Sequence, residues 1–279
     1  MKLRAKAYLR IAAAYLRIVA EDWRDKYDEV KNFHEGLTLV RLKDKYGFVD
    51  PETGKEVVPP KYTYVEDFHE GFARVRVFDC RGYGFVDKTG KEVVPPKYDE
   101  VKNFHEGFAK VYLDGEWGFV DKEGNEVVPP KYDEVKNFHE GLAAVGDLEE
   151  RWGFVDKEGN EVVPPKYEEV EDFHEGLAQV FDCRGYGFVD QQGKEVVPPK
   201  YTYVEDFHEG FARVEHEPEW GFVDKEGNEV VPPKYDEVKN FHEGLARVEL
   251  NGKWGFVDKK GNEYWNMTED QAREQMNKG

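Results

Sequence analysis

The sequence predicts an all-β protein built from seven four-stranded antiparallel repeats, and three observations support this. A Lys-Tyr-Asp-Glu-Val-Lys-Asn-Phe-His-Glu-Gly string or a close variant begins seven times in the 279-residue chain. An aromatic-Gly-Phe-Val-Asp motif also recurs seven times, 34 to 37 residues apart. Between turn signals lie short β-branched and aromatic runs, and none is long enough for a helix. The motif glycines are Gly47, Gly84, Gly118, Gly153, Gly187, Gly221 and Gly255.

The third repeat shows how one unit is built. Its extended segments are Tyr98–Val101, Phe108–Val111, Trp117–Asp121 and Glu126–Val128. The Asp-Lys-Glu-Gly-Asn and Asp-Gly connections between them have the chemistry of tight hairpin turns. Pro129 and Pro130 have no backbone N–H, so we expect them to end the fourth strand. Each repeat is therefore predicted to be a four-stranded meander.

A 34-residue meander cannot bury both faces of its sheet alone, so neighbouring repeats must stack. A closed seven-bladed β-propeller and an open β-solenoid both meet this requirement. We favour the propeller, because whole repeats are present and the predicted strand at 27–30 can pair beside the one at 263–265 to close a ring. The repeated aromatic residues, including Trp117, are expected to form the core.

The repeated pattern reads Trp-Gly-Phe-Val-Asp-Lys-x-Gly-x-Glu-Val-Val-Pro-Pro-Lys-Tyr-Asp-x-Val, followed by Phe-x-Glu-Gly-Leu-Ala-x-Val. It resembles the bacterial WG, or KWG, repeats over residues 26–265. Tyrosine replaces the family's tryptophan at Tyr46, Tyr83 and Tyr186, which keeps the aromatic ring. The resemblance implies a module that mediates interactions, and it brings no shared catalytic residues.

The two ends of the chain are predicted to be helical. Within residues 1–25, the 3,4-spaced apolar side chains predict an amphipathic helix over 3–24. It is expected to dock on the repeats; recruitment of a partner, self-association and a membrane-surface location are the alternatives. Within residues 266–279, Thr268 and Gln271 match a capping box, which predicts a short helix over about 269–277.

Charge and cysteine usage narrow the class of partner. The formal net charge is −19, but residues 1–25 carry +3, which leaves −22 for the remainder. Such an acidic body repels phosphate backbones, so we expect no nucleic-acid partner. No segment has the length of a membrane span or a secretory signal core. Cys80 and Cys183 occupy equivalent places in separate repeats, so both thiols are expected to be unpaired, which favours a reducing, cytoplasmic location. We also expect the protein to be a monomer.

The repeated polar residues are predicted to shape turns rather than to perform chemistry. Each Phe-His-Glu-Gly segment reads as a tight corner, and each aspartate after Phe-Val begins a turn. Catalysis needs one constellation of unlike groups, whereas these groups are copied seven times. We therefore expect no catalytic residue, no cofactor and no metal site. The corner histidines are His34, His69, His105, His139, His174, His208 and His242.

The segment before each aromatic-Gly pair varies most between repeats and holds the changes in length. Variable exposed loops are where repeat scaffolds often bind, although drift on an unconstrained surface explains the variation equally well. The leading functional prediction is a non-catalytic scaffold for a protein or peptide. An idealised repeat protein without a natural ligand is the alternative, and a metal-binding ring or an enzyme comes third. The candidate binding residues are Arg76, Arg81, Tyr112, Glu116, Glu149, Arg151, Arg184, Glu217 and Asn251.

Overall fold

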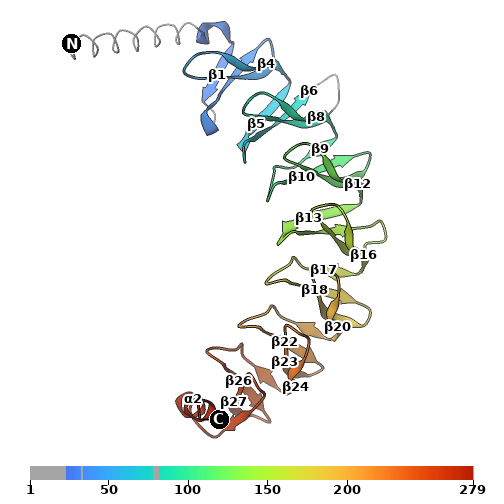
Figure 1. Cartoon of the computed structure of the whole chain (residues 1–279), viewed down its shortest axis with the longest axis vertical. Coiled ribbons are helices and arrows are strands. Elements are labelled where there is room, and N and C mark those ends of the chain that lie inside the picture. The colour runs from blue at the N-terminus through green and yellow to red at the C-terminus, as the bar shows by residue number, and fades with distance from the viewer. Residues whose placement is uncertain (1–22, 33, 78–81, 279) are drawn as a thin grey trace, which may run out of the picture. The chain divides into compact units, whose positions relative to one another are not determined.

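The computed structural model describes residues 23–32, 34–77 and 82–278, and its strands form seven four-stranded sheets (Figure 1). Each sheet is an antiparallel meander of four consecutive strands, so the predicted architecture of the repeat is confirmed. The chain divides into an N-terminal unit, residues 1–133, and a C-terminal unit, residues 134–279. Closure of a ring by residues 27–30 and 263–265 would join these two units, and it remains a prediction.

The N-terminal unit contains the first three sheets and two short 3-10 helices, η1 and η2. Of the predicted helix over 3–24, only Trp23 and Arg24 are described, and Arg24 begins η1. The elements are η1 Arg24–Lys26, β1 Glu29–Asn32, η2 His34–Gly36, β2 Thr38–Leu42, β3 Lys45–Val49, β4 Glu56–Tyr62, β5 Tyr64–His69, β6 Phe72–Val77, β7 Gly82–Asp87, β8 Glu92–Tyr98, β9 Glu100–Val101, β10 Phe108–Leu113, β11 Glu116–Asp121 and β12 Glu126–Tyr132.

The C-terminal unit contains the other four sheets and helix α2. Its elements are β13 Glu134–His139, β14 Leu142–Gly146, β15 Trp152–Asp156, β16 Glu161–Tyr167, β17 Glu169–Val170, β18 Leu177–Asp182, β19 Gly185–Asp190, β20 Glu195–Tyr201, β21 Tyr203–Val204, β22 Phe211–His216, β23 Glu219–Asp224, β24 Glu229–Tyr235, β25 Glu237–Val238, β26 Leu245–Leu250, β27 Lys253–Asp258, β28 Glu263–Trp265 and α2 Glu269–Met276.

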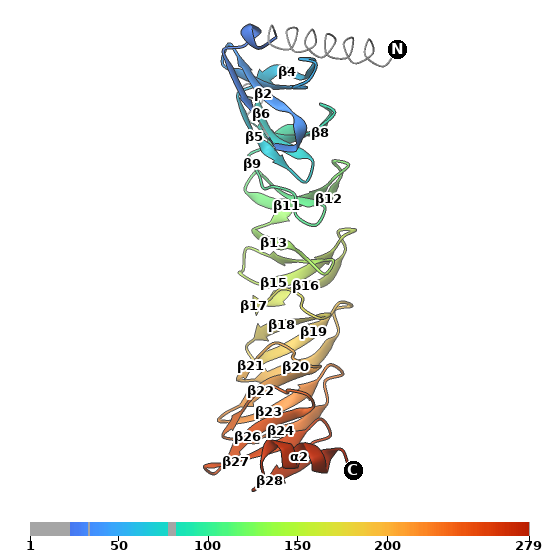
Figure 2. The same ribbon diagram turned by 90° about the vertical axis from the view of Figure 1, so that its left-hand side faces the viewer.

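Helix α2 confirms the predicted capping box and lies beside the last sheet (Figure 2). The Thr268 hydroxyl accepts the Gln271 N–H, and the Gln271 side chain accepts the Thr268 N–H at 2.9 Å. Ala272 is buried against Leu245 and Tyr264. The helix thus covers apolar surface that the last sheet would otherwise expose to water.

The Pro-Pro pair does not end the fourth strand, so that expectation was wrong. β12 continues through both prolines to Tyr132, which pairs with Trp117, while Val128 pairs with Phe119. Between these two pairs, Gly118 alone stands opposite residues 129–131. The missing proline N–H groups are tolerated because β12 is the outer strand of its sheet and bulges at this point.

This bulge explains why glycine follows the aromatic residue of the motif. A Cβ atom on Gly118 would lie 2.3 Å from the Val128 carbonyl oxygen and 2.7 Å from the Pro130 nitrogen. Both are backbone atoms and cannot move aside. Any larger residue would therefore push the outer strand away from the sheet.

The core lies between successive sheets rather than within one. In the C-terminal unit, Phe188 and Tyr201 of the fifth sheet pack against Val204, Phe207 and Val214 of the sixth. The Phe188 and Phe207 rings have centroids 4.9 Å apart. Each sheet thus needs its neighbour to bury these rings, as the repeat length predicted.

The motif tryptophans are not the buried centre of the core, which corrects the sequence expectation. Trp117, Trp152 and Trp220 are each only half-buried, whereas Tyr201 and Phe222 are almost fully buried. The tyrosine of Lys-Tyr and the phenylalanine of Gly-Phe-Val therefore fill the space between sheets. The tryptophans cover the rim of that space.

A lysine, a tyrosine and a glutamate connect successive repeats beside this core. Lys200 and Tyr201 donate to the same Glu229 oxygen, at 2.7 and 2.8 Å. The hydrogen bond from Lys200, followed by that from Tyr201, lowers the pKa of Glu229. Burial raises the pKa of Tyr201, so it remains a neutral donor. Equivalent contacts between successive sheets join Lys61 and Tyr62 to Glu92, Lys97 and Tyr98 to Glu126, Lys166 and Tyr167 to Glu195, and Lys234 and Tyr235 to Glu263. Lys26 and Tyr27, which precede β1, make the same contact with Glu56 of the first sheet.

Truncation of a core ring should cost far more than truncation of a rim ring. Phe222→Ala is expected to lower the free energy of unfolding by about 3–5 kcal/mol, because Phe222 is 1% exposed. The half-buried Trp220→Ala should lose about 1–2 kcal/mol. Leu148→Ser, at a side chain 85% exposed, is the control and should stay within roughly 0.5 kcal/mol. Urea unfolding checks the order, and a larger loss for Trp220→Ala than for Phe222→Ala would contradict it.

The Lys-Tyr-Glu contacts predict a loss of stability in acid. Because the pKa of Glu229 is lowered on folding from its ordinary 4.5, the unfolded chain binds protons first as the pH falls. The stabilisation is complete above the ordinary pKa and disappears as the pH falls through the lower, folded-state pKa. Urea midpoints should therefore drop as pH is lowered from neutral to about 3.

Two variants separate this effect from general acid unfolding. Glu229→Gln should lower the urea midpoint at neutral pH and make its fall in acid shallower, because the titrating group is gone. Glu226→Gln removes an exposed carboxylate of the same repeat and should change neither property. Equal pH profiles for the Glu229→Gln variant and the unmodified protein would contradict the assignment.

Candidate functional site

The predicted binding residues lie in the hairpins between the second and third strands, where local bonds hold them. The Asn251 N–H donates to Asp236 at 2.6 Å, and the Glu217 N–H donates to the Thr202 hydroxyl at 3.2 Å. Exposed Glu116 begins β11 of such a hairpin. These two turns are therefore tied to the residue that precedes the first strand of their own repeat.

Other predicted residues meet partners only within their own repeats. Arg151 pairs with Asp147 at 2.9 Å and Glu149 at 3.0 Å, and Arg184 pairs with Asp182 at 2.6 Å. The Tyr112 ring packs on Trp117, with centroids 4.9 Å apart.

Arg76 lies 5.1 Å from the centre of the Tyr83 ring. Arg81 and Cys80 lie outside the described residues. Within each unit, the structure thus presents the described residues of this set one hairpin at a time.

The histidine corners are two-residue turns, as the sequence indicated. The His208 N–H donates to the Phe211 carbonyl at 2.8 Å, and the reverse bond is 3.1 Å. Between them Glu209 has φ 51° and Gly210 has φ 86°, the left-handed pair of a type I′ turn. The glutamate is therefore part of the turn rather than of an extended strand.

The corner glutamates and turn aspartates accept hydrogen bonds that hold the turns in place. Glu209 accepts the N–H groups of Glu243 at 2.9 Å and Gly244 at 3.4 Å, which belong to the next corner. Asp224 accepts the Asn228 N–H at 2.7 Å within its own turn. Among the described residues, no group of three or more His, Cys, Asp or Glu side chains is arranged to hold a metal ion.

Chelation should leave the melting temperature unchanged, because metal-dependent folds lose stability when stripped. His139 Nε2 lies 3.3 Å from an Asp172 carboxylate oxygen, which is an ordinary polar contact. Thermal unfolding with and without excess chelator checks this, alongside metal analysis of the untagged protein. A large fall in melting temperature, or stoichiometric zinc or nickel, would contradict it.

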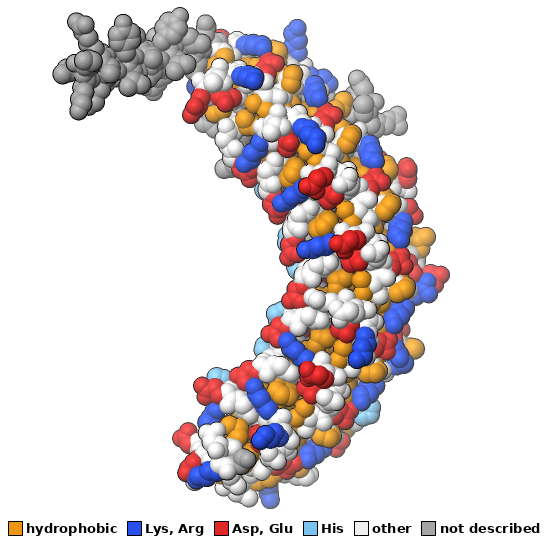
Figure 3. Space-filling view, in the orientation of Figure 1, with side chains coloured by type: hydrophobic (Ala, Val, Ile, Leu, Met, Phe, Trp, Pro, Cys, Tyr) orange, Lys and Arg blue, Asp and Glu red, His pale blue; other side chains and the backbone are white. Residues whose placement is uncertain are grey.

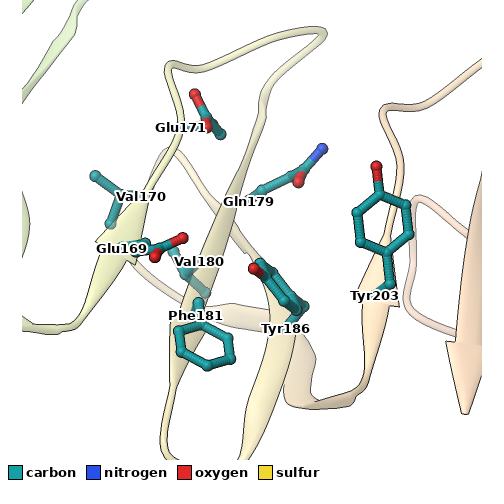
Figure 4. Close-up of a pocket in the computed structure, with 8 residues that line it drawn as sticks. All are labelled: Glu169, Val170, Glu171, Gln179, Val180, Phe181, Tyr186 and Tyr203. Atoms are coloured by element: carbon teal, nitrogen blue, oxygen red, sulfur yellow. The ribbon is translucent and has the colours of Figure 1, made fainter. Parts of the chain in front are cut away.

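A pocket of about 190 Å³ opens between the fifth and sixth sheets (Figure 4). We call it the seam pocket. Val170 is buried in the core, and Glu169 and Glu171 on either side of it line the pocket, with Glu169 directed toward Val180 (Figure 4). Its lining residues are Glu169, Val170, Glu171, Gln179, Val180, Phe181, Tyr186 and Tyr203.

Aromatic rings form the wall of the seam pocket. The Tyr186 centroid lies 4.6 Å from that of Phe181 and 6.2 Å from that of Tyr203. Tyr203 in turn lies 6.0 Å from Trp220 and is 46% exposed. The pocket therefore offers an exposed aromatic surface that crosses from one repeat to the next.

The seam pocket is also anionic. Burial raises the pKa of the Tyr186 hydroxyl. The charges of Glu169, Tyr203 and Glu171, in decreasing order of effect, raise this pKa further. Within residues 23–32, 34–77 and 82–278, no hydrogen bond or ion pair engages either carboxylate side chain. On the face of the molecule shown in Figure 3, charged side chains of both signs are interspersed with hydrophobic and other side chains.

An equivalent pocket of about 300 Å³ lies between the second and third sheets, but it contains its own cation. There Arg74 donates to Glu66 at 2.7 Å and to the Val101 carbonyl at 2.8 Å. Gln179 occupies the position of Arg74 in the fifth repeat. Sequence reasoning missed this site because it compared the hairpin loops; comparison of strand positions between repeats would have shown the missing cation.

A family model described as a WG-containing repeat matches the chain seven times, at residues 26–46, 46–77, 83–117, 117–146, 152–181, 186–217 and 220–254. No curated protein matches. Solved structures of low similarity include the computationally designed Ika8 protein, at 14% identity over 86% of this chain and 84% of that one, with a TM-score of 0.34. Another is Hsv2p of Kluyveromyces lactis, at 10% identity over 83% and 93%, with a TM-score of 0.32.

In the part of the chain that the structure describes, no helix has both the length and the apolar character needed to cross a membrane.

Proposed function

The chain belongs to the WG-containing repeat family, and on that basis we propose that it is a non-catalytic scaffold that binds a protein or peptide partner. The seam pocket carries this proposal, because it combines exposed aromatic rings with carboxylates that no described cation neutralises. Tyrosines are enriched at protein interfaces, since they bury a large rigid ring and keep a polar tip. Tyr203, 46% exposed, and Tyr64, 41% exposed, present such rings at two seams.

The hairpin residues extend the proposed surface. Arg184 belongs to the fifth repeat, as does the seam pocket, and Glu217 belongs to the sixth. Both are exposed at the turns of these repeats. We assign the aromatic pocket the main contact and the hairpins a supporting role, because hot spots in interfaces are few and central.

An idealised repeat protein without a natural ligand is the competing proposal, and the near-identity of the core residues favours it. The exposed unpaired thiol of Cys183 supports a reducing, cytoplasmic setting for either proposal. We propose no catalytic role, since the corner glutamates and turn aspartates recur in each repeat and those such as Glu209 and Asp224 are hydrogen-bonded within the fold.

Selection from a random peptide library tests the proposal. The full chain should enrich peptides that bind with Kd on the order of micromolar. A control chain carrying Gln179→Arg and Tyr203→Glu places at both positions residues that other repeats contain, and should lose most of that binding. Failure to enrich any peptide above the control chain would favour the idealised-scaffold alternative.

A further inference from the structure

A cation lies over the motif aromatic ring in six of the seven repeats. The pairs are Arg41 over Tyr46, Arg76 over Tyr83, Lys102 over Trp117, Lys136 over Trp152, Arg213 over Trp220 and Arg247 over Trp254, with cation-to-centroid distances from 4.2 to 6.0 Å. Among the residues that the structure describes, Tyr186 of the fifth repeat has no such cation. These cations come from different strand positions: Arg213 and Arg247 align with Gln179, Lys102 and Lys136 with Glu171, and Arg41 and Arg76 with Phe181. Beside Tyr186, the place that an arginine takes in the sixth and seventh repeats therefore holds no cation.

The sixth repeat shows how that place is filled by an arginine. Arg213 Nε donates to Glu205 at 2.8 Å, and Arg213 Nη1 donates to the Val238 carbonyl of the next repeat at 2.9 Å. Its Cζ lies 5.7 Å from the centre of the Trp220 ring. One guanidinium thus meets a carboxylate, a strand carbonyl and an aromatic face at once.

The fifth repeat keeps all three of these partners and lacks the arginine. By repeat position, Glu171 corresponds to Glu205, the Val204 carbonyl to that of Val238, and Tyr186 to Trp220. Gln179 replaces the arginine and donates instead to Asp206 at 2.8 Å. Glu169 adds a second carboxylate, and no side chain among the described residues donates to the Val204 carbonyl.

We propose that the seam pocket binds the side chain of an arginine presented by a partner peptide. The guanidinium would occupy the place that Arg213 takes one repeat later, bonded to Glu171 and to the Val204 carbonyl against the Tyr186 ring. Glu169 and Tyr203 would enclose it from the other side. This proposal rests on the proposed function as a peptide-binding scaffold and names the chemistry that the scaffold recognises.

Arginine is favoured over lysine because the site offers separated acceptors and a flat ring. A planar guanidinium reaches a carboxylate and a carbonyl together while stacking on the ring, whereas an ammonium is a compact point charge. Lys136 occupies a related place in the fourth repeat, where it donates to the Val170 carbonyl at 2.8 Å. Among the described residues, no carboxylate accepts a hydrogen bond from Lys136 at that place. A neutral side chain of the same shape would leave both glutamates unneutralised.

The test titrates the full chain with Ac-Gly-Arg-Gly-NH2 and follows backbone amide NMR shifts. Saturable shifts are expected at residues 169–171, 179–181, 186 and 203–204, with Kd on the order of millimolar for a single side chain. The lysine tripeptide should bind several-fold more weakly, and the citrulline tripeptide about tenfold or more weakly, since citrulline keeps the shape without the charge. Equal binding of citrulline, shifts confined to other residues or no saturable shift would overturn the proposal.

Gln179→Arg is the decisive variant, because Arg74 and Arg213 show that the scaffold accepts arginine there. Its own guanidinium should fill the pocket and weaken tripeptide binding about tenfold or more. Gln192→Arg adds the same charge in an exposed turn of the same repeat and should leave Kd within about twofold. Glu171→Gln should also weaken binding, and the backbone amide NMR spectrum of this variant checks that its fold is intact. Unchanged affinity in the Gln179→Arg and Glu171→Gln variants would overturn the assignment.

The two levels of the proposal can fail separately. Selected peptides that bind without arginine would keep the scaffold function and overturn the arginine pocket. Saturable binding of the arginine tripeptide without any enriched peptide would keep the pocket and overturn the scaffold function.

Discussion

The structure depends on one constraint: a four-stranded sheet of about 34 residues cannot bury its aromatic side chains by itself. Phe188 and Tyr201 of the fifth sheet become buried only because Val204 and Phe207 of the sixth cover them. The Lys-Tyr-Glu contacts then fix the spacing of the sheets at one edge. Within each unit, the repeat sequence is conserved in the residues that meet this constraint.

The same constraint creates the candidate site. Neighbouring sheets pack closely at Phe188 and Phe207, but they separate toward the first strands, where Glu169 and Tyr203 face solvent. In the other six repeats a lysine or arginine lies over the motif ring, and in the sixth repeat that arginine also bonds Glu205. The fifth repeat keeps the ring and the carboxylates without the cation. A site can therefore arise in a repeat protein by the loss of one internal partner.

Much of the fold could be predicted from the sequence, because turn chemistry and β-rich segments repeat seven times. The four strands, the corners at Glu209 and Gly210, and the capping box at Thr268 all follow from local rules. The strand through Pro129 and Pro130 did not, because tolerance of proline depends on an edge position and on the bulge over Gly118. These are relations between strands, which a reading of one segment does not include.

Burial and the site were harder to predict for the same reason. Trp117 is the largest residue of its motif, but sheet stacking places it at the rim. The hairpin loops were predicted to bind because they vary most between repeats. The residue that distinguishes the seam pocket is instead Gln179, in the middle of a strand. The effect of Gln179 on the pocket depends on Glu171 and on the Val204 carbonyl, which lie outside its strand and which the fold brings near it.

The most direct test of the central constraint is the dependence of stability on the number of repeats. Truncated chains with one, two, three and four repeats, taken from residues 131–265 and ending with the last repeat, can be compared by circular dichroism and urea unfolding. The account predicts an unfolded single repeat and a midpoint and denaturant slope that rise as repeats are added. A single repeat that folds alone, with the same midpoint as the longer chains, would contradict it.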